Sequence, residues 1–253
     1  IAGSVSTVKA EKIEDTPAAA FDQALQGQVP GLTVLSDSGE PSEAAAMAIR
    51  GTNSINSGTA PLYILDGVAI SSRDFNTINP SDIESLSVLK DASSTSIYGA
   101  RAANGVIVIT TKRGRMADRA KIDYRMQLGF SQIAYGDLMN TSERIQYEKE
   151  LGLTDGKNYN VLAKTDVNWL DEVFSNAALL QNYELSVSGA SEKTNYYVSG
   201  GYYSQDGTAV GSSFERYSIR ANVEQRAAKW LKLGTNTMMN YQTIEKADDG
   251  EYT

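Results

Sequence analysis

The sequence of 253 residues contains no cysteine and no histidine. Without cysteine, this chain has no disulfide framework, zinc ribbon, iron–sulfur cluster or thiol nucleophile. Without histidine, it has no Ser-His-Asp triad and no His-ligated metal. Phosphate-binding glycine loops, the G-x-S-x-G nucleophile motif and the EF-hand loop are also missing. We therefore predict that the protein is not an enzyme and carries no metal or cofactor.

Positive charge and long apolar runs are also scarce. The chain has 23 Lys and Arg against 31 Asp and Glu, which argues against a nucleic-acid binder with its usual basic stripe. No run reaches the roughly 18 apolar residues of a transmembrane helix. The first residues, Ile1 to Ser4, do not resemble a signal peptide, so we interpret the chain as processed or as an internal fragment. Its 14 Tyr, against 5 Phe and 2 Trp, suit strands that contact both water and an apolar phase.

Residues 1–115 mix helix and strand signals. A polar cap followed by proline at Asp15–Pro17 predicts the start of a helix, and Pro30-Gly31 predicts its end. The Asp66-Gly67 pair between two apolar runs is a strong signal for a tight β-hairpin. Further strands are predicted at 32–35, 47–51, 84–89 and 105–111, and a short helix at 92–98. This mixture predicts an α+β domain.

Residues 116–253 change to a period of two. Apolar and polar residues alternate clearly along four segments and more weakly along a fifth: 122–131, 182–188, 217–224, 231–241 and 193–204. Long links (136–180 and 205–213) alternate with short ones (190–192 and 227–229). Long strands with alternating long and short connections are typical of a transmembrane β-barrel. Periodicity leaves a soluble antiparallel sandwich open as an alternative.

Several segments carry a family resemblance. They are LKDASSTSIYGARAANGVIVITTKRG (89–114), PLYILDGV (61–68), MAIRGTNSIN (47–56), ALQGQVPGLTV (24–34), the long segment 169–207 and WLKLG (230–234). These motifs resemble the plug domain and first barrel strands of SusC/RagA-like TonB-dependent outer-membrane transporters of Bacteroidetes-type Gram-negative bacteria. The resemblance spans nearly the whole chain. It implies a plug domain over 1–115, followed by the N-terminal part of a barrel over 116–253.

The resemblance implies a function in the outer membrane. Such proteins fill a barrel of about 22 strands with a plug, bind a SusD-like lipoprotein lid, and use TonB to import oligosaccharides or peptides. The family's TonB-contacting box would lie before Ile1, outside this sequence. The alternatives are a siderophore- or cobalamin-type receptor and a non-transporting adhesin or structural barrel.

The site residues follow as expectations. Polar loops between patterned strands are a usual setting for binding residues, so the loops 52–60 and 71–79 supply our substrate-contact candidates. These are Asn53, Asn56, Arg73 and Asn76. Arginines among small and apolar residues usually pair with carboxylates, so we predict that Arg50 and Arg101 anchor the plug to the barrel. Their expected partners are Glu184 and Glu224, which alternation places on the polar face.

Overall fold

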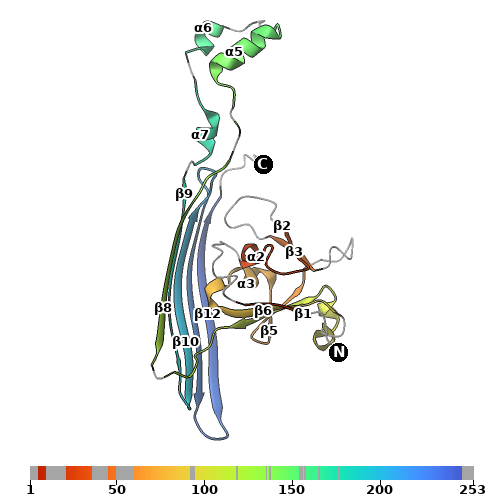
Figure 1. The fold of residues 1–253 in the computed structure, drawn as a ribbon, viewed down its shortest axis with the longest axis vertical. Helices are drawn as coiled ribbons and strands as arrows, with labels where there is room; N and C mark the ends of the chain where they lie inside the picture. The colour runs from red at the N-terminus through yellow and green to blue at the C-terminus, as the bar shows by residue number, and fades with distance from the viewer. Residues whose placement is uncertain are drawn as a thin grey trace.

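The computed structural model describes residues 5–9, 21–35, 45–49, 60–91, 95–117, 119–134, 136, 138–153, 156, 158–164, 166–175 and 177–246. A small α+β domain lies against one face of a tall antiparallel sheet (Figure 1). We call these two units the plug and the wall. The predicted division at residue 115 falls between the last plug strand, which ends at Thr111, and the first wall strand, which begins at Lys121.

The plug is built on a five-stranded sheet with the order β1-β6-β7-β4-β5. Its strands are β1 (Val5–Lys9), β4 (Leu62–Leu65), β5 (Val68–Ile70), β6 (Ile83–Leu89) and β7 (Val106–Thr111). Strand β4 runs parallel to β7, and the other neighbours are antiparallel. A separate ladder joins β2 (Leu32–Leu35) to β3 (Ala46–Ile49). The predicted Asp66-Gly67 hairpin is confirmed, since these residues connect β4 to β5 with positive φ angles of 48° and 90°.

Short helices close the plug core. They are α2 (Phe21–Ala24), α3 (Ser72–Asn76) and the 3₁₀ turns η1 (Pro80–Asp82) and η2 (Ser96–Ala102). The Phe75 ring packs 4.9 Å from Phe21 and 4.3 Å from Tyr63, measured between centroids, so α3 covers the sheet through a single aromatic anchor. The predicted helix start at Asp15–Pro17 lies outside the described residues.

The wall is a meander of five long antiparallel strands in sequence order. These are β8 (Lys121–Ser131), β9 (Ala178–Ala190), β10 (Thr194–Asp206), β11 (Ser213–Arg226) and β12 (Lys232–Glu245). The register is regular across all four pairings. An α+β plug followed by long antiparallel strands is the predicted fold: the start of a transmembrane β-barrel. Neither outer strand is paired on its second side within the described sheet, so five strands do not close a barrel.

The two faces of the wall differ as the alternation predicts. One face turns away from the plug and exposes large apolar side chains, among them Ile122, Leu128, Phe130, Ile219, Met239 and Tyr241. The other face carries polar residues that are buried against the plug, including Asn182, Ser218, Arg220 and Asn222. The weak pattern of β10 also resolves into two faces. Tyr197 and Tyr203 are buried, whereas Val198 is 42% exposed.

The connections also follow the predicted lengths. A long excursion between β8 and β9 carries α5 (Thr141–Glu150), α6 (Tyr159–Leu162) and α7 (Trp169–Val173), and it rises above the sheet in Figure 1. Short turns at the opposite end of the sheet join β9 to β10 and β11 to β12. Among the helices that the structure describes, none is long and apolar enough to cross a membrane.

Candidate functional site: the contact between plug and wall

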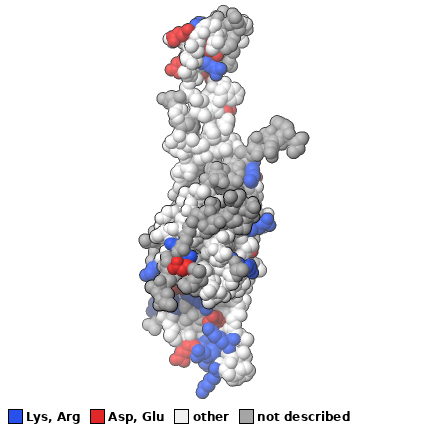
Figure 2. All heavy atoms as spheres, turned by 90° about the vertical axis from the view of Figure 1, so that its right-hand side faces the viewer, with Lys and Arg blue, Asp and Glu red and all other residues white. Residues whose placement is uncertain are grey.

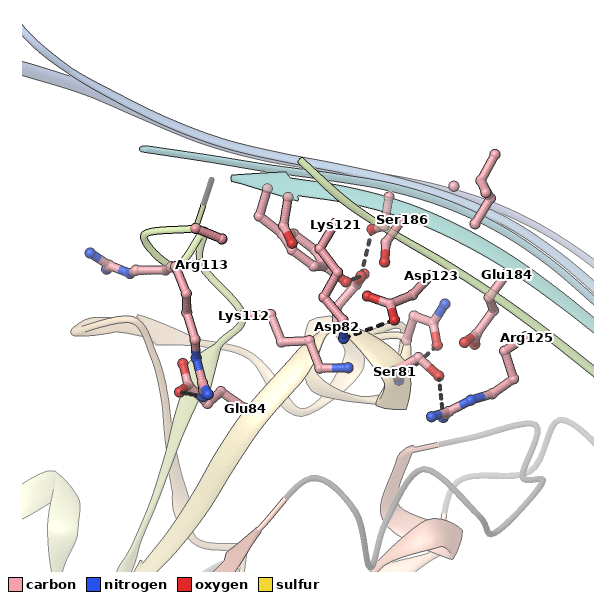
Figure 3. A pocket seen from close by; sticks show the side chains of 18 of the residues that line it. Ser81, Asp82, Glu84, Lys112, Arg113, Lys121, Asp123, Arg125, Glu184 and Ser186 are labelled. Atoms are coloured by element: carbon pink, nitrogen blue, oxygen red, sulfur yellow. Dashed lines mark hydrogen bonds and ion pairs between the residues drawn. The ribbon is translucent and has the colours of Figure 1, made fainter. Parts of the chain in front are cut away.

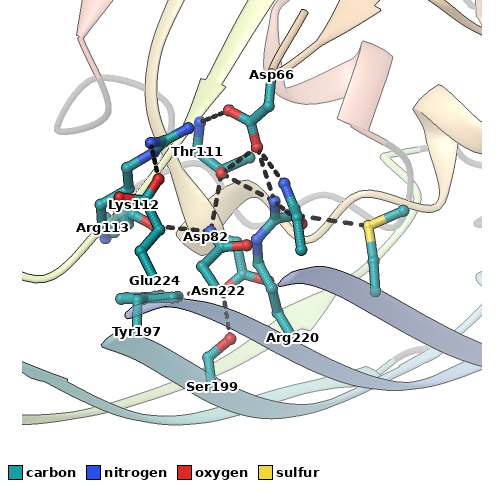
Figure 4. A network of polar contacts seen from close by, with 12 residues as sticks. Asp66, Asp82, Thr111, Lys112, Arg113, Tyr197, Ser199, Arg220, Asn222 and Glu224 are labelled. Atoms are coloured by element: carbon teal, nitrogen blue, oxygen red, sulfur yellow. Dashed lines mark hydrogen bonds and ion pairs between the residues drawn. The ribbon is translucent and has the colours of Figure 1, made fainter. Parts of the chain in front are cut away.

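The plug is held to the wall mainly by polar side chains. On the plug they come from the β4–β5 turn, the end of β7 and the η1 turn, and on the wall from the inner faces of β10, β11 and β12 (Figure 4). We call the central group the Arg220 network. It consists of Asp66, Thr111, Arg220, Asn222 and Asn236.

Arg220 is the centre of this network. Its side chain is fully buried, and its Nη2 donates to Asp66 Oδ2 at 3.1 Å, Thr111 Oγ1 at 2.8 Å and Asn236 Oδ1 at 3.0 Å. Asn236 returns a bond of 2.7 Å from its amide to the same Asp66 oxygen. Asp66 is fixed from the plug side by the Thr111 backbone N–H at 3.0 Å and the Thr111 hydroxyl at 2.5 Å. A charge on the wall is therefore matched by a charge on a plug turn.

Further bonds extend the contact along β10, β11 and β12. The amide of Asn222 donates to Thr111 Oγ1 at 3.1 Å and to the Lys112 carbonyl at 3.0 Å. Asn79 Nδ2 donates to Ser218 Oγ at 3.4 Å, and Asn240 Nδ2 donates to Thr77 Oγ1 at 3.2 Å. These bonds lie at different positions along the wall strands. Together they fix the orientation of the plug as well as its position.

Asp82 is a second buried plug carboxylate at this contact. Its Oδ1 accepts from the Tyr197 hydroxyl at 3.0 Å and from the Ser199 hydroxyl at 2.5 Å, both on β10. Burial raises the pKa of Asp82 above its usual range, and the Ser199 hydroxyl, the Arg220 charge and the Tyr197 hydroxyl oppose that rise. Asp82 therefore contributes to the contact mainly as a hydrogen-bond acceptor in a desolvated place.

The raised pKa of Asp82 gives a pH prediction. A carboxyl whose pKa is higher in the folded state stabilises the fold at low pH, and its contribution is lost as pH rises past the unfolded value. Asp82→Asn keeps an acceptor oxygen but removes this titration. We expect the wild type to lose more stability than Asp82→Asn between about pH 4 and about pH 7. Urea unfolding of the full-length protein at both pH values measures this, with the exposed Asp123→Asn as control. Equal pH dependence in all three proteins would contradict it.

An asparagine of the wall binds the linker that leads from the plug to the wall. Asn195 on β10 accepts from the Gly114 N–H at 2.9 Å and donates to the Gly114 carbonyl at 2.9 Å. Gly114 packs directly against the backbone of β9 and β10. A Cβ at this position would be 2.0 Å from the Gly189 carbonyl oxygen and 2.6 Å from that of Tyr196. Only glycine fits this approach.

Gly114→Ala is expected to displace the linker and to lower the free energy of plug unfolding by about 1–3 kcal/mol, the usual cost of overpacking. Urea unfolding of the full-length protein is the measurement. Gly136→Ala is the matched control, because no atom of the described residues lies within 4 Å of its added Cβ, its chain neighbours aside. Equal stability of both variants would show that the linker moves without cost.

The predicted anchors are placed differently from our expectation. Arg101 is exposed on η2, and Glu224 does join the wall to the 1–115 segment, but through Arg113 at 2.9 Å; it also pairs with Lys232 at 2.5 Å. Glu184 does face the plug side, where it accepts from Asn182 at 3.4 Å. Arg50 lies outside the described residues. Pairing of Arg101 with these glutamates is therefore not the arrangement found, because the buried arginine of the contact belongs to the wall and its carboxylate to the plug.

The substrate-contact candidates separate into two groups. Asn53 and Asn56 lie outside the described residues. Arg73 is exposed on α3, whose first turn is capped by Ser71. Asn76 hydrogen-bonds instead to the carboxylate of Asp22, which is fully buried and also accepts from the Ala45 N–H at 2.6 Å. Burial raises the pKa of Asp22, and these bonds oppose the rise. Asn76 is thus placed to stabilise the plug core.

The chain is similar in sequence to known outer-membrane receptors. A family profile described as the TonB-dependent receptor plug domain matches residues 1–106. The chain is 35% identical over 254 residues to TonB-dependent receptor P26 of Formosa agariphila, covering 97% of this chain and 25% of that protein. It is 34% identical over 230 residues to TonB-dependent receptor SusC of Bacteroides thetaiotaomicron, covering 87% of this chain and 22% of that protein. The chain thus spans about a quarter of the length of these relatives.

A solved structure agrees with the family profile and with these relatives. The RagAB peptide transporter superposes with a TM-score of 0.88 at 37% identity, covering 99% of this chain and 32% of that chain. A plug fixed to the inner face of barrel strands defines a TonB-dependent receptor. Within that class, the chain belongs to the SusC/RagA-like transporters, as its plug and first barrel strands. A ferric enterobactin receptor at 16% identity and a TM-score of 0.60 shares the fold alone.

Proposed function

We propose that the whole protein imports oligosaccharides or peptides across the outer membrane, energised by TonB and assisted by a SusD-like lipoprotein lid. The observation that carries this proposal is a plug held inside a barrel wall by separable polar contacts. Similarity over most of the chain to SusC and to the RagAB peptide transporter supports the nutrient class, whereas a rhizobactin receptor matches over 82 residues and a ferric enterobactin receptor shares the fold alone.

The chemistry of the contact suits a plug that must move. The plug core is formed by plug residues, and among the described wall residues only the partly buried Met238 packs against it. Hydrogen bonds and ion pairs can be exchanged for water, whereas a shared apolar core could not be separated without a large hydrophobic cost. Arg220 Nε and Asn222 Oδ1 are buried without a partner among the described residues, so the network is incompletely satisfied. Force on the plug would therefore separate it from the wall before its core is disrupted.

A transport assay tests the proposal. Cells with the full-length protein should remove oligosaccharides or peptides from the medium, and uptake should stop when TonB or the proton gradient is removed. Binding to the outer surface should persist under the same treatment. Uptake that continues without TonB would contradict energised import, and surface binding without any uptake would favour the adhesin alternative.

Substrate contact by the plug loops remains part of the proposal. We retain Asn53, Asn56 and Arg73 as candidates, because all three belong to polar segments between patterned strands. Asn76 is left out, since its amide is bonded to Asp22. Arg73→Ala should weaken surface binding of the substrate while leaving the amount of assembled protein unchanged, and equal affinity would remove Arg73 from the site.

A further inference from the structure

The plug is fastened to only part of the wall. Its bonds to β10, β11 and β12 include those of the buried Tyr197 and Arg220 and that of the exposed Asn236. A cleft of about 510 Å3 lies between the plug, β8 and β9, and Tyr197 and Ser199 of β10 also line it (Figure 3). Next to the cleft, the linker contacts β9, because Gly114 packs against Gly189. Across this cleft, Arg125 Nη1 reaches the Ser81 hydroxyl only at 3.5 Å. The described bonds between plug and wall are therefore more numerous toward β10–β12 than toward β8 and β9.

The lining of the cleft is strongly ionic. Six cationic side chains line it, namely Lys112, Arg113, Arg115, Arg119, Lys121 and Arg125. Four carboxylates join them, namely Asp82, Glu84, Asp123 and Glu184. Some pair with each other, as Arg115 does with Glu84 at 2.9 Å and Lys121 with Asp123 at 2.8 Å. These pairs are partly exposed, so a solute can exchange with them at little cost.

The cleft offers little that a neutral sugar would need. Among the described residues that line it, Tyr197 is the single aromatic one; it is 4% exposed and donates its hydroxyl hydrogen to Asp82. A sugar ring would therefore find no free aromatic face on which to stack. A solute with charges of both signs would find partners of both signs. Figure 2 shows Lys and Arg side chains gathered, with some acidic ones, at the end of the molecule that carries the short turns.

We propose that the transported solute passes the plug along β8 and β9 through this cleft, and that the ionic lining favours short zwitterionic oligomers, as peptides are. This inference rests on the proposed import function. The plug stays fastened to β10–β12 during passage, while its open side widens. The cleft already separates plug from wall on this side, so fewer buried bonds must break there than on the Arg220 side.

A pair of bulky substitutions tests the route. Ser186 and Ser188 on β9 line the cleft, two residues apart. Thr235 and Thr237 on β12 have the same spacing and are exposed on the outer face, where their hydroxyls hydrogen-bond to each other at 3.3 Å. Ser186→Trp with Ser188→Trp should fill the cleft, whereas Thr235→Trp with Thr237→Trp should not. Full-length variants in cells are compared by depletion of a tryptic casein digest and of a partial starch hydrolysate, with the amount of assembled protein measured in parallel.

Each outcome either supports or contradicts the proposed route and solute class. The proposal expects the wild type and the β12 variant to deplete peptides, and the β9 variant to lose uptake while keeping surface binding. Peptide uptake by the β9 variant at the wild-type rate would overturn the route, and depletion of starch oligomers alone would overturn the solute class. Depletion of neither mixture by the wild type would instead defeat the proposed function. If the β9 variant does not assemble, Arg119→Gln with Lys121→Gln keeps the volume and should slow uptake of acidic peptides; an unchanged rate would count against the proposal.

Discussion

Replacing Arg220 with alanine is expected to release the plug from the wall without preventing barrel assembly. The Arg220 side chain is 0% exposed and that of Asp66 is 6% exposed, so the substitution leaves a buried carboxylate without its cation. Removing one partner of a buried pair typically costs about 3–5 kcal/mol. Urea unfolding of the plug in the full-length protein should shift by that amount. Passive permeability of reconstituted vesicles to small solutes should rise.

Two further variants separate this mechanism from a general loss of packing. Arg226→Ala removes an exposed arginine from the end of the same strand and should change neither measurement. The double variant Arg220→Met with Asp66→Asn removes both charges together and should recover part of the lost stability, because no unpaired charge remains. If Arg220→Ala were as stable as Arg226→Ala, the network would not hold the plug.

Leu128→Arg is expected to prevent stable insertion of the wall. Leu128 is 55% exposed on the face turned away from the plug, which is the lipid-facing side of a barrel strand. An arginine there costs up to about 2–4 kcal/mol at the bilayer midplane. Gln127→Arg is the control, because Gln127 lies on the plug side and bonds to Asn182 at 3.0 Å. The measurement is the fraction of full-length protein in the outer-membrane pellet. Equal insertion of both variants would contradict the assignment of faces.

Asn222 on β11 cannot be replaced by every polar residue. Alternation alone places Asn222 on the polar face, where a glutamate would be tolerated. The Asn222 amide, however, donates to Thr111 and to the Lys112 carbonyl, and a glutamate cannot donate. We therefore expect Asn222→Glu to weaken the plug contact.

The wall could be predicted from sequence because its signal is local. Side chains alternate with a period of two along each strand, so the residues themselves show which face meets lipid and which meets the lumen. The Asp66-Gly67 turn was equally readable, since few residues other than glycine accept positive φ. In both cases residues that are neighbours in the sequence determine the local structure.

The plug contact could not be predicted in the same way, because it joins residues far apart in the chain. Arg220 was visible as a cation on a polar face, but nothing local indicates that it meets Asp66, 154 residues earlier. Local sequence identifies Asp66 only as a turn residue and indicates no role for Asp82. The flanks of Arg50 and Arg101 suggested buried arginines, yet Arg101 is exposed. The available signal is that Ser218 and Asn222, two residues to either side of Arg220, share its face of the strand.

The Arg220 network also bears on how such proteins can be recombined. The plug has its own hydrophobic core, so a plug from a relative should fold in its new chain. It would nevertheless meet a foreign inner face, on which the residues at positions 220, 222 and 236 decide whether Asp66 and Thr111 find partners. Chimeric receptors therefore need these wall positions to be transplanted together with the plug, and the natural unit of exchange includes parts of β11 and β12.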